Sequence, residues 1–159
     1  MNDETELYIQ RAENELVTAQ LLFDVSSNPT IQKEQFKLEK EFTFYSSVIS
    51  HSYYCIFYSA KSILVKNGVK TEAPEVHKKT LGAFEINLVK TGKLDVELLK
   101  IYRKIIVRAE ELLGIFSKEK GKRGDFTYQK LPQANREPAK ESLDNASFFF
   151  KNINKIVRK

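Results

Sequence analysis

The short sequence RGDFTY, residues 123–128, places three side chains together that could bind a phosphate ester. The planar guanidinium of Arg123 can hold two phosphate oxygens at once, and the carboxylate of Asp125 could orient it. The ring of Tyr128 offers a surface on which a nucleobase could stack. The structural alternative is an Arg123–Asp125 ion pair that fixes the turn, with Tyr128 packed against the end of the fold. The sequence leaves both interpretations open.

Charge is distributed unevenly along the 159 residues, whose formal net charge is +5. Residues 1–24 contain six carboxylates against Arg11 alone, a net charge of −5, whereas the last nine residues contain four basic side chains and no acid. The segment KEKGKRGDFTYQK adds a further local excess of Lys and Arg. Excess positive charge attracts phosphate, but a basic tail also suits a helix C-terminus. Charge therefore favours a nucleotide or nucleic acid as partner without requiring one.

The remaining reactive side chains point to no metal and no cofactor. Cys55 is the only cysteine, so neither an intramolecular disulfide nor a Cys-rich zinc site can form, and His51 and His77 match no ligand spacing. The sequence has no Gly-rich phosphate-binding motif. The acidic N-terminus lacks an apolar signal core, and the run YYCIFY is far shorter than a membrane span. We therefore expect a soluble cytoplasmic protein.

Apolar residues recur at steps of three and four along most of the chain, which is the pattern of amphipathic helices. It predicts helices over 4–23, 44–66, 74–89, 95–118 and 137–157. No segment alternates with the period of two that a strand requires. The sequence thus predicts one all-α domain over residues 1–159, an antiparallel up-and-down helical bundle of four long helices plus a shorter fifth. Residues 28–43 are charged and ambiguous, and their structure is left undecided.

The helix predicted over 44–66 contains HSYYCIFYSAKSIL and has two distinct faces. The first, which includes Ile49, Tyr53, Ile56, Phe57, Ala60, Ile63 and Leu64, is expected to fill the core. The second consists of His51, Tyr54, Tyr58 and Lys61 at steps of three and four. Because Tyr is enriched at interfaces, we expect this second face to pack against another copy of the chain. Ligand contact and a solvated surface are the alternatives.

Four segments of this sequence, in order, resemble the HEPN domain family. They are HSYYCIFYSAKSILVKNG, EVHKKTLGAFEINLVKTGKLD, RGDFTY and AKESLDNASFFFKNIN, which together extend over nearly the whole chain. The pair Tyr53-Tyr54 with the small Ala60 resembles the family's second helix. His77-Lys78 resembles its HK before the third helix. The resemblance implies an up-and-down bundle, often dimeric and often encoded beside, or fused to, a minimal nucleotidyltransferase. Some members are toxins that cleave RNA and are neutralised by their partners.

The ribonuclease members carry an Arg followed, four to six residues later, by a His. Here no His follows Arg123, and Tyr128 stands where the shortest spacing would place it. A phenol with a pKa of about 10 poorly replaces an imidazole with a pKa near 6.5 as an acid–base catalyst. We therefore expect a non-catalytic binding module, homodimeric, that associates with a minimal nucleotidyltransferase and contacts nucleotide or RNA. A ribonuclease toxin that uses Arg123 with Tyr128 or a distant His remains the alternative, so the sequence does not decide whether the protein is an enzyme.

Overall fold

The computed structural model describes residues 2–114 and 135–159, and within these residues every regular element is a helix. The elements are α1 (Asp3–Ser26), α2 (Pro29–Glu34), α3 (Tyr45–Lys66), α4 (Val76–Phe84), a π-helical turn η1 (Glu85–Val89), α5 (Val96–Leu113) and α7 (Arg136–Val157). The all-α class expected from the sequence is confirmed. None of the helices described is long and apolar enough to span a bilayer.

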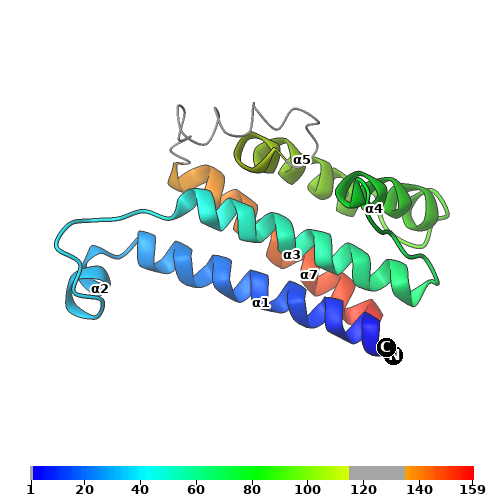
Figure 1. Cartoon of the computed structure of the whole chain (residues 1–159), viewed down its shortest axis with the longest axis horizontal. Coiled ribbons are helices and arrows are strands. Elements are labelled where there is room, and N and C mark those ends of the chain that lie inside the picture. Colours follow the sequence, from blue (N-terminus) through cyan, green and yellow to red (C-terminus); the bar gives the residue numbers. More distant parts are fainter. Residues whose placement is uncertain (1, 115–134) are drawn as a thin grey trace.

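Helix α3 lies at the centre of the bundle and packs against α1, α7, α5 and α4. Figure 1 shows α1, α3 and α7 running side by side, with α5 and α4 above them, and the two chain ends close together. Successive long helices run in opposite directions (Figure 1), which is the up-and-down arrangement that the sequence predicted. The other three long helices, α1, α5 and α7, therefore all contact α3.

The core forms where the sequence placed its apolar positions. The α3 residues expected to face inward are all buried: Ile49, Tyr53, Ile56, Phe57, Ala60, Ile63 and Leu64. In α7 the periodic positions Ala139, Leu143, Ala146, Phe150, Ile153 and Val157 are also buried. Three aromatic rings, Phe84, Tyr102 and Phe149, meet edge-on or tilted between α4, α5 and α7. Interlocking rings of this kind fix the separation of the three helices.

Residues 28–43, left undecided by the sequence, belong to an arm, residues 27–44, that projects beyond one end of the bundle (Figure 1). It contains the short helix α2, whose first turn is capped by the side chain of Asn28. At the centre of the arm lies Gln32, which is only 2% exposed. Its side-chain amide nitrogen donates to the carbonyl oxygens of Val25 and Phe42, and its side-chain oxygen accepts from the backbone amide of Phe42. Three hydrogen bonds to one buried side chain make the arm an ordered structure.

Three of the predicted helix boundaries differ from the structure by two residues or more. The first helix, expected to end at residue 23, continues to Ser26. The helix expected over 74–89 begins only at Val76, and its last turn, Glu85–Val89, is a π-turn. The helix expected to continue to residue 118 ends at Leu113, because Gly114 adopts a left-handed conformation (φ 59°) and caps it by donating to the carbonyl of Glu110. A residue without a Cβ takes this conformation readily, so Gly114 terminates the helix.

Candidate functional site

Arg123, Asp125 and Tyr128, the three residues predicted to contact nucleotide or RNA, lie outside the described residues. The structure describes the helix before them, α5, and the helix after them, α7. Between these two helices, Glu141 of α7 forms ion pairs with Lys104 and Arg108 of α5. The hydrogen bond from Lys104 is the main cause that holds the pKa of Glu141 below its usual value. Arg108 is thus engaged by a carboxylate on the neighbouring helix.

The predicted interface residue His51 is held by a carboxylate on α1. Its Nδ1 lies 2.5 Å from Oε2 of Glu15, and the two side chains are 35% and 24% exposed. A carboxylate at this distance orients the imidazole ring and favours the tautomer that keeps a proton on the shared nitrogen. The pair joins α1 to α3 at the surface of the bundle.

Tyr58, a second member of that face, also contacts α1. Its ring lies 6.2 Å from that of Tyr8, nearly parallel at 16°. The guanidinium of Arg11 lies over both rings, at 5.9 Å from Tyr8 and 5.7 Å from Tyr58. Each contact is within the range of a cation–π interaction. This part of the α3 face is therefore covered in part by side chains of the same subunit.

Lys61 is the most buried of the four predicted interface residues, with only 9% of its surface exposed. Its ammonium group donates to the backbone carbonyl of Thr71 at 2.9 Å and lies 4.8 Å from the centre of the Tyr8 ring. Tyr54 is half-buried, with its ring 6.2 Å from that of Tyr58. The predicted set His51, Tyr54, Tyr58 and Lys61 is thus brought together on one face, but it is not one freely exposed strip. Its role in dimerisation stays a prediction.

Periodicity gave no indication of a polar pair between α3 and α4. The hydroxyl of Tyr53 lies 2.8 Å from Nδ1 of His77, and the ring of Phe57 lies 4.4 Å from the His77 ring. Burial lowers the pKa of His77, with a further contribution from the charge of Lys61, so the imidazole is neutral at pH 7. The contact holds His77 of α4 against the central helix α3. Helix-face spacing cannot reveal a bond between residues 24 positions apart.

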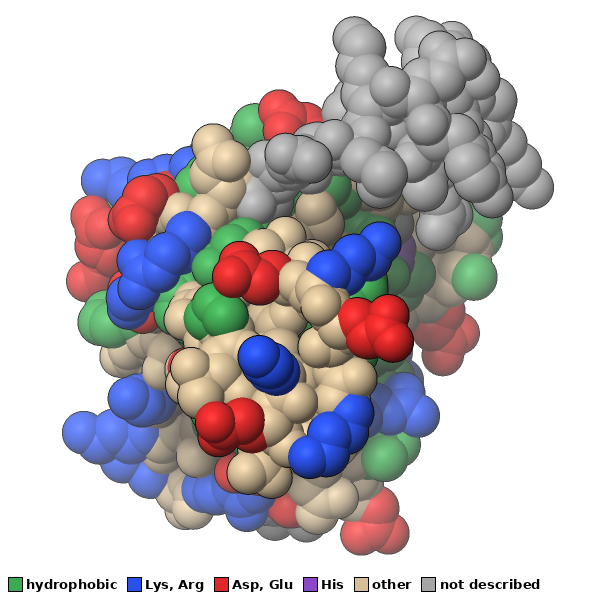
Figure 2. Space-filling model, turned by 90° about the vertical axis from the view of Figure 1, so that its left-hand side faces the viewer, with side chains coloured by type: hydrophobic (Ala, Val, Ile, Leu, Met, Phe, Trp, Pro, Cys, Tyr) green, Lys and Arg blue, Asp and Glu red, His purple; other side chains and the backbone are tan. Residues whose placement is uncertain are grey.

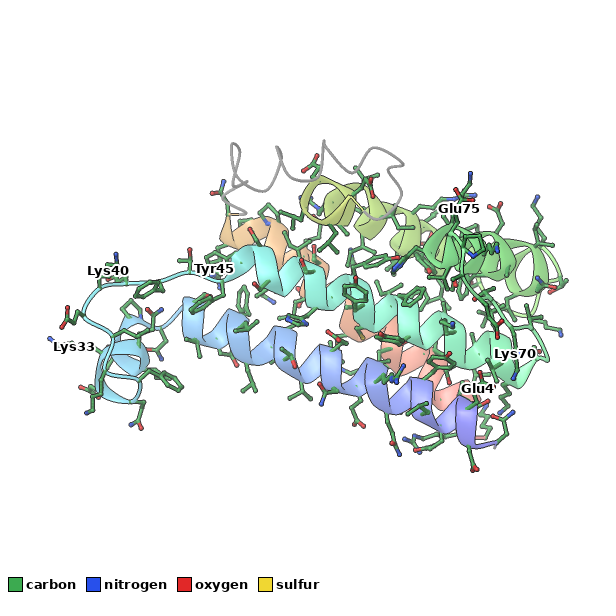
Figure 3. The ribbon with its side chains drawn as sticks, in the orientation of Figure 1. Glu4, Lys33, Lys40, Tyr45, Lys70 and Glu75 are labelled. Carbon is green, nitrogen blue, oxygen red and sulfur yellow. The ribbon has the colours of Figure 1, made fainter. Side chains whose placement is uncertain are left out.

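Two further features lie apart from these contacts. Cys55 is fully buried, and burial raises the pKa of its thiol, so it is not set up as a nucleophile. A hollow of about 220 Å³ lies on the arm, lined by Lys and Glu side chains together with Pro29, Gln32 and Leu38. Figure 2 shows that acidic and basic side chains are interspersed over this end of the molecule, and Figure 3 shows Lys33 and Lys40 on the arm. Among the described residues, no three side chains are grouped to bind a metal ion.

The family model of the HEPN domain matches residues 5–156, and the chain therefore belongs to the HEPN domain family. A protein of Thermotoga maritima, named UPF0332 protein, is 29% identical to this chain over 111 residues. The matched region covers 70% of this chain and 71% of the relative. The match extends over all the long helices, so the bundle described above is the family's domain.

Proposed function

We propose that the protein is a non-catalytic binding module, a homodimer that associates with a minimal nucleotidyltransferase and contacts nucleotide or RNA through Arg123, Asp125 and Tyr128. Membership of the HEPN family supports the proposal, since domains of this family often dimerise. The basic composition of the segment around Arg123 supports a phosphate-containing ligand.

The observation that carries the proposal is the placement of the chain's two imidazoles. His51 and His77 are the only histidines, and neither follows Arg123 in sequence. His77 is bonded to Tyr53 and covered by Phe57, whereas His51 is bonded to Glu15. Both rings have fixed partners on a neighbouring helix. With no His after it in the sequence, Arg123 can hold a phosphate group, but its segment offers no imidazole of suitable pKa to move the proton.

Binding and cleavage of RNA separate the proposal from its alternatives. The purified protein should bind a fluorescently labelled oligoribonucleotide with an affinity that falls steeply as salt rises, because phosphate contacts release counterions. The Arg123→Ala variant should weaken this binding at least tenfold. Arg103→Ala is the matched control, since Arg103 is an exposed arginine of α5 that is paired with Glu85 of η1. Robust RNA cleavage that disappears in Arg123→Ala would refute a non-catalytic role.

Association is tested separately from RNA binding. Sedimentation equilibrium should give the mass of two subunits. A minimal nucleotidyltransferase encoded beside this gene should co-purify with the protein at a constant ratio. A monomer at high concentration contradicts the dimer, and failure to co-purify contradicts the partner.

The ribonuclease toxin remains a second candidate because of the His51–Glu15 pair. A half-exposed imidazole oriented by a carboxylate is the arrangement of a general base. If this pair serves catalysis, expression of the protein alone should arrest growth and degrade RNA. The His51→Gln variant should relieve both effects. Normal growth and intact RNA on expression of the wild-type protein count against the toxin.

A further inference from the structure

Arg11 differs from the other arginines of the described chain because no carboxylate pairs with it. The others each form an ion pair with a glutamate: Arg103 with Glu85, Arg108 with Glu141, Arg136 with Glu137 and Arg158 with Glu6. Arg11 forms no ion pair among the described residues, although residues 1–24 contain six carboxylates. Its exposed guanidinium lies instead over the rings of Tyr8 and Tyr58, at 5.9 Å and 5.7 Å from their centres.

The carboxylates that the helix brings to the side of Arg11 and Tyr8 are engaged by other groups. Residues four positions apart lie on the same side of a helix. Glu15, four positions after Arg11, is held by His51 of α3. Glu4, four positions before Tyr8, pairs with Lys70 at 2.7 Å (Figure 3). The positive charge of Arg11 is therefore not offset on its own side of α1.

A second cation, Lys61 of α3, contacts the same tyrosine. Its ammonium group lies 4.8 Å from the centre of the Tyr8 ring and 5.9 Å from that of Phe57, and it donates to the backbone carbonyl of Thr71. The side chain is only 9% exposed, and no carboxylate of the described residues pairs with it. Burying an ammonium group without a counter-ion is costly, because one carbonyl and two rings replace only part of its hydration.

Two unmatched positive charges beside one aromatic ring make a site for an anion. We propose that Arg11 and Lys61 bind the phosphate group of a small ligand where α1 packs against α3. Arg11, which is exposed, makes the contact, and the rings of Tyr8 and Tyr58 hold its guanidinium in place. Lys61 adds its charge from inside the protein, where the low dielectric strengthens the attraction. None of these residues belongs to the contact proposed at Arg123.

A phosphate monoester fits this pair of charges better than a carboxylate. Its second pKa is about 6, so at pH 7.5 it carries close to two negative charges. A carboxylate carries one and would leave one of the two cations unmatched. The planar guanidinium of Arg11 also presents parallel N–H donors that match two oxygens of one phosphate group. The chemistry of the site therefore favours a dianionic phosphate.

The charge of α1 restricts the ligand to a small molecule. Residues 1–24 carry a net charge of −5. An RNA strand lying along α1 would bring its phosphates near carboxylates such as Glu13 and Asp24, and exposed charges repel each other over about 8 Å at physiological ionic strength. A ligand with one phosphate group avoids most of this repulsion. The site is therefore suited to a single phosphate and not to a polyanion.

Isothermal titration calorimetry tests the site and identifies the source of the phosphate. Inorganic phosphate, ribose 5-phosphate and AMP are titrated at pH 7.5 and constant ionic strength, with acetate as the monoanion control. At least one phosphate compound should bind, and acetate should bind at least tenfold more weakly. Equal affinities for the three would show that the free ion suffices, whereas tighter binding of the esters would identify a phosphate ester as the ligand. If no phosphate compound binds at millimolar concentrations, or acetate binds as tightly, the proposal is overturned.

Substitutions locate the binding. Arg11→Ala should weaken binding of the tightest probe at least tenfold, because it removes charge-assisted hydrogen bonds. Arg103→Ala removes an exposed arginine that is paired with Glu85 and should leave the affinity unchanged. Lys61→Met keeps an unbranched side chain at the buried position and removes its charge, so it should also weaken binding. Because Arg11 is exposed, its variant tests the site even if Lys61→Met does not fold. Unchanged affinity in Arg11→Ala would overturn the inference.

Arg123→Ala separates this site from the proposed contact with nucleotide or RNA. This variant should bind the oligoribonucleotide more weakly and retain its affinity for the small phosphate compound. Arg11→Ala should show the reverse. If Arg123→Ala loses the small ligand and Arg11→Ala keeps it, the ligand belongs to the Arg123 segment, and only the present inference fails. If Arg11→Ala loses the small ligand and Arg123→Ala binds RNA as the wild type does, the contact proposed at Arg123 fails and this site stands.

Discussion

Two buried tyrosines in the same core should respond in opposite ways to the loss of a hydroxyl group. Tyr53 and Tyr102 are both 0% exposed. The Tyr53 hydroxyl has Nδ1 of His77 as its partner at 2.8 Å, whereas the Tyr102 hydroxyl has no hydrogen-bond partner within the described structure. The Phe substitution removes one oxygen in each case and leaves the ring packing intact. The pair therefore isolates the contribution of a single hydrogen bond.

The size of each effect follows from what remains after the substitution. Tyr53→Phe removes a hydrogen bond worth about 1 kcal/mol and leaves the half-buried Nδ1 of His77 without that partner, so we expect a loss of about 1–2 kcal/mol in the free energy of unfolding. Tyr102→Phe removes a polar group that was buried without compensation. We expect this variant to be as stable as the wild type or more stable by about 1 kcal/mol.

Urea unfolding at pH 7.5 measures both variants, because His77 is neutral there and its protonation does not contribute. The comparison is valid if the dependence of the unfolding free energy on urea is unchanged between variants. The reasoning fails if Tyr102→Phe is destabilised by as much as Tyr53→Phe, or if Tyr53→Phe matches the wild type. The double variant Tyr53→Phe/His77→Gln should cost little more than His77→Gln alone, because the two side chains share one bond.

Three further predictions concern pH, the arm and the first helix. Burial in the folded protein lowers the pKa of His77 from 6.5, so just below pH 6.5 the unfolded chain binds more protons than the folded one. The free energy of unfolding should therefore fall as the pH drops through 6.5. The variant His77→Gln should flatten this dependence in urea midpoints measured from pH 5 to 8. Gln32→Ala removes two hydrogen bonds to Phe42 inside the arm and one to Val25 of α1, and it should speed amide exchange at Phe42 at least tenfold. Exchange in α3 should not change, and neither should exchange at Phe42 in the matched variant Gln35→Ala, whose side chain is exposed. Asn2 caps α1 by accepting from the Thr5 amide at 2.7 Å, so Asn2→Ala should lower the free energy of unfolding by about 1 kcal/mol in urea titrations, and an unchanged midpoint would contradict the cap.

The helices and their buried faces could be predicted from sequence because both follow from local periodicity. A helix that buries one side must repeat apolar residues at three and four, and the inward positions of α3 and α7 show that repeat. The arm could not be predicted in this way. Its order depends on Gln32, a polar side chain whose partners are backbone groups at Val25 and Phe42, and such bonds leave no periodic signal.

The candidate site was only partly predictable, for a related reason. The spacing of His51, Tyr54, Tyr58 and Lys61 correctly placed them on one face of α3. It could not show that Lys61 reaches the Thr71 carbonyl and is buried, because that contact depends on how the chain returns after α3. The bond between Tyr53 and His77 likewise joins two helices whose relative rotation no single-helix pattern determines.

The same limitation applies to the docking surface that the sequence predicted on α3. Tyrosine enrichment pointed to α3, but a tyrosine can be covered by its own subunit as well as by a partner, and Tyr8 and Arg11 of α1 lie against Tyr58 in this way. Leu7, Val17 and Leu21 have no such cover within the described chain and are 45–59% exposed. Burial of such side chains yields about 25 cal/mol for each Å² of apolar surface removed from water, whereas rings already half-covered have less surface left to bury.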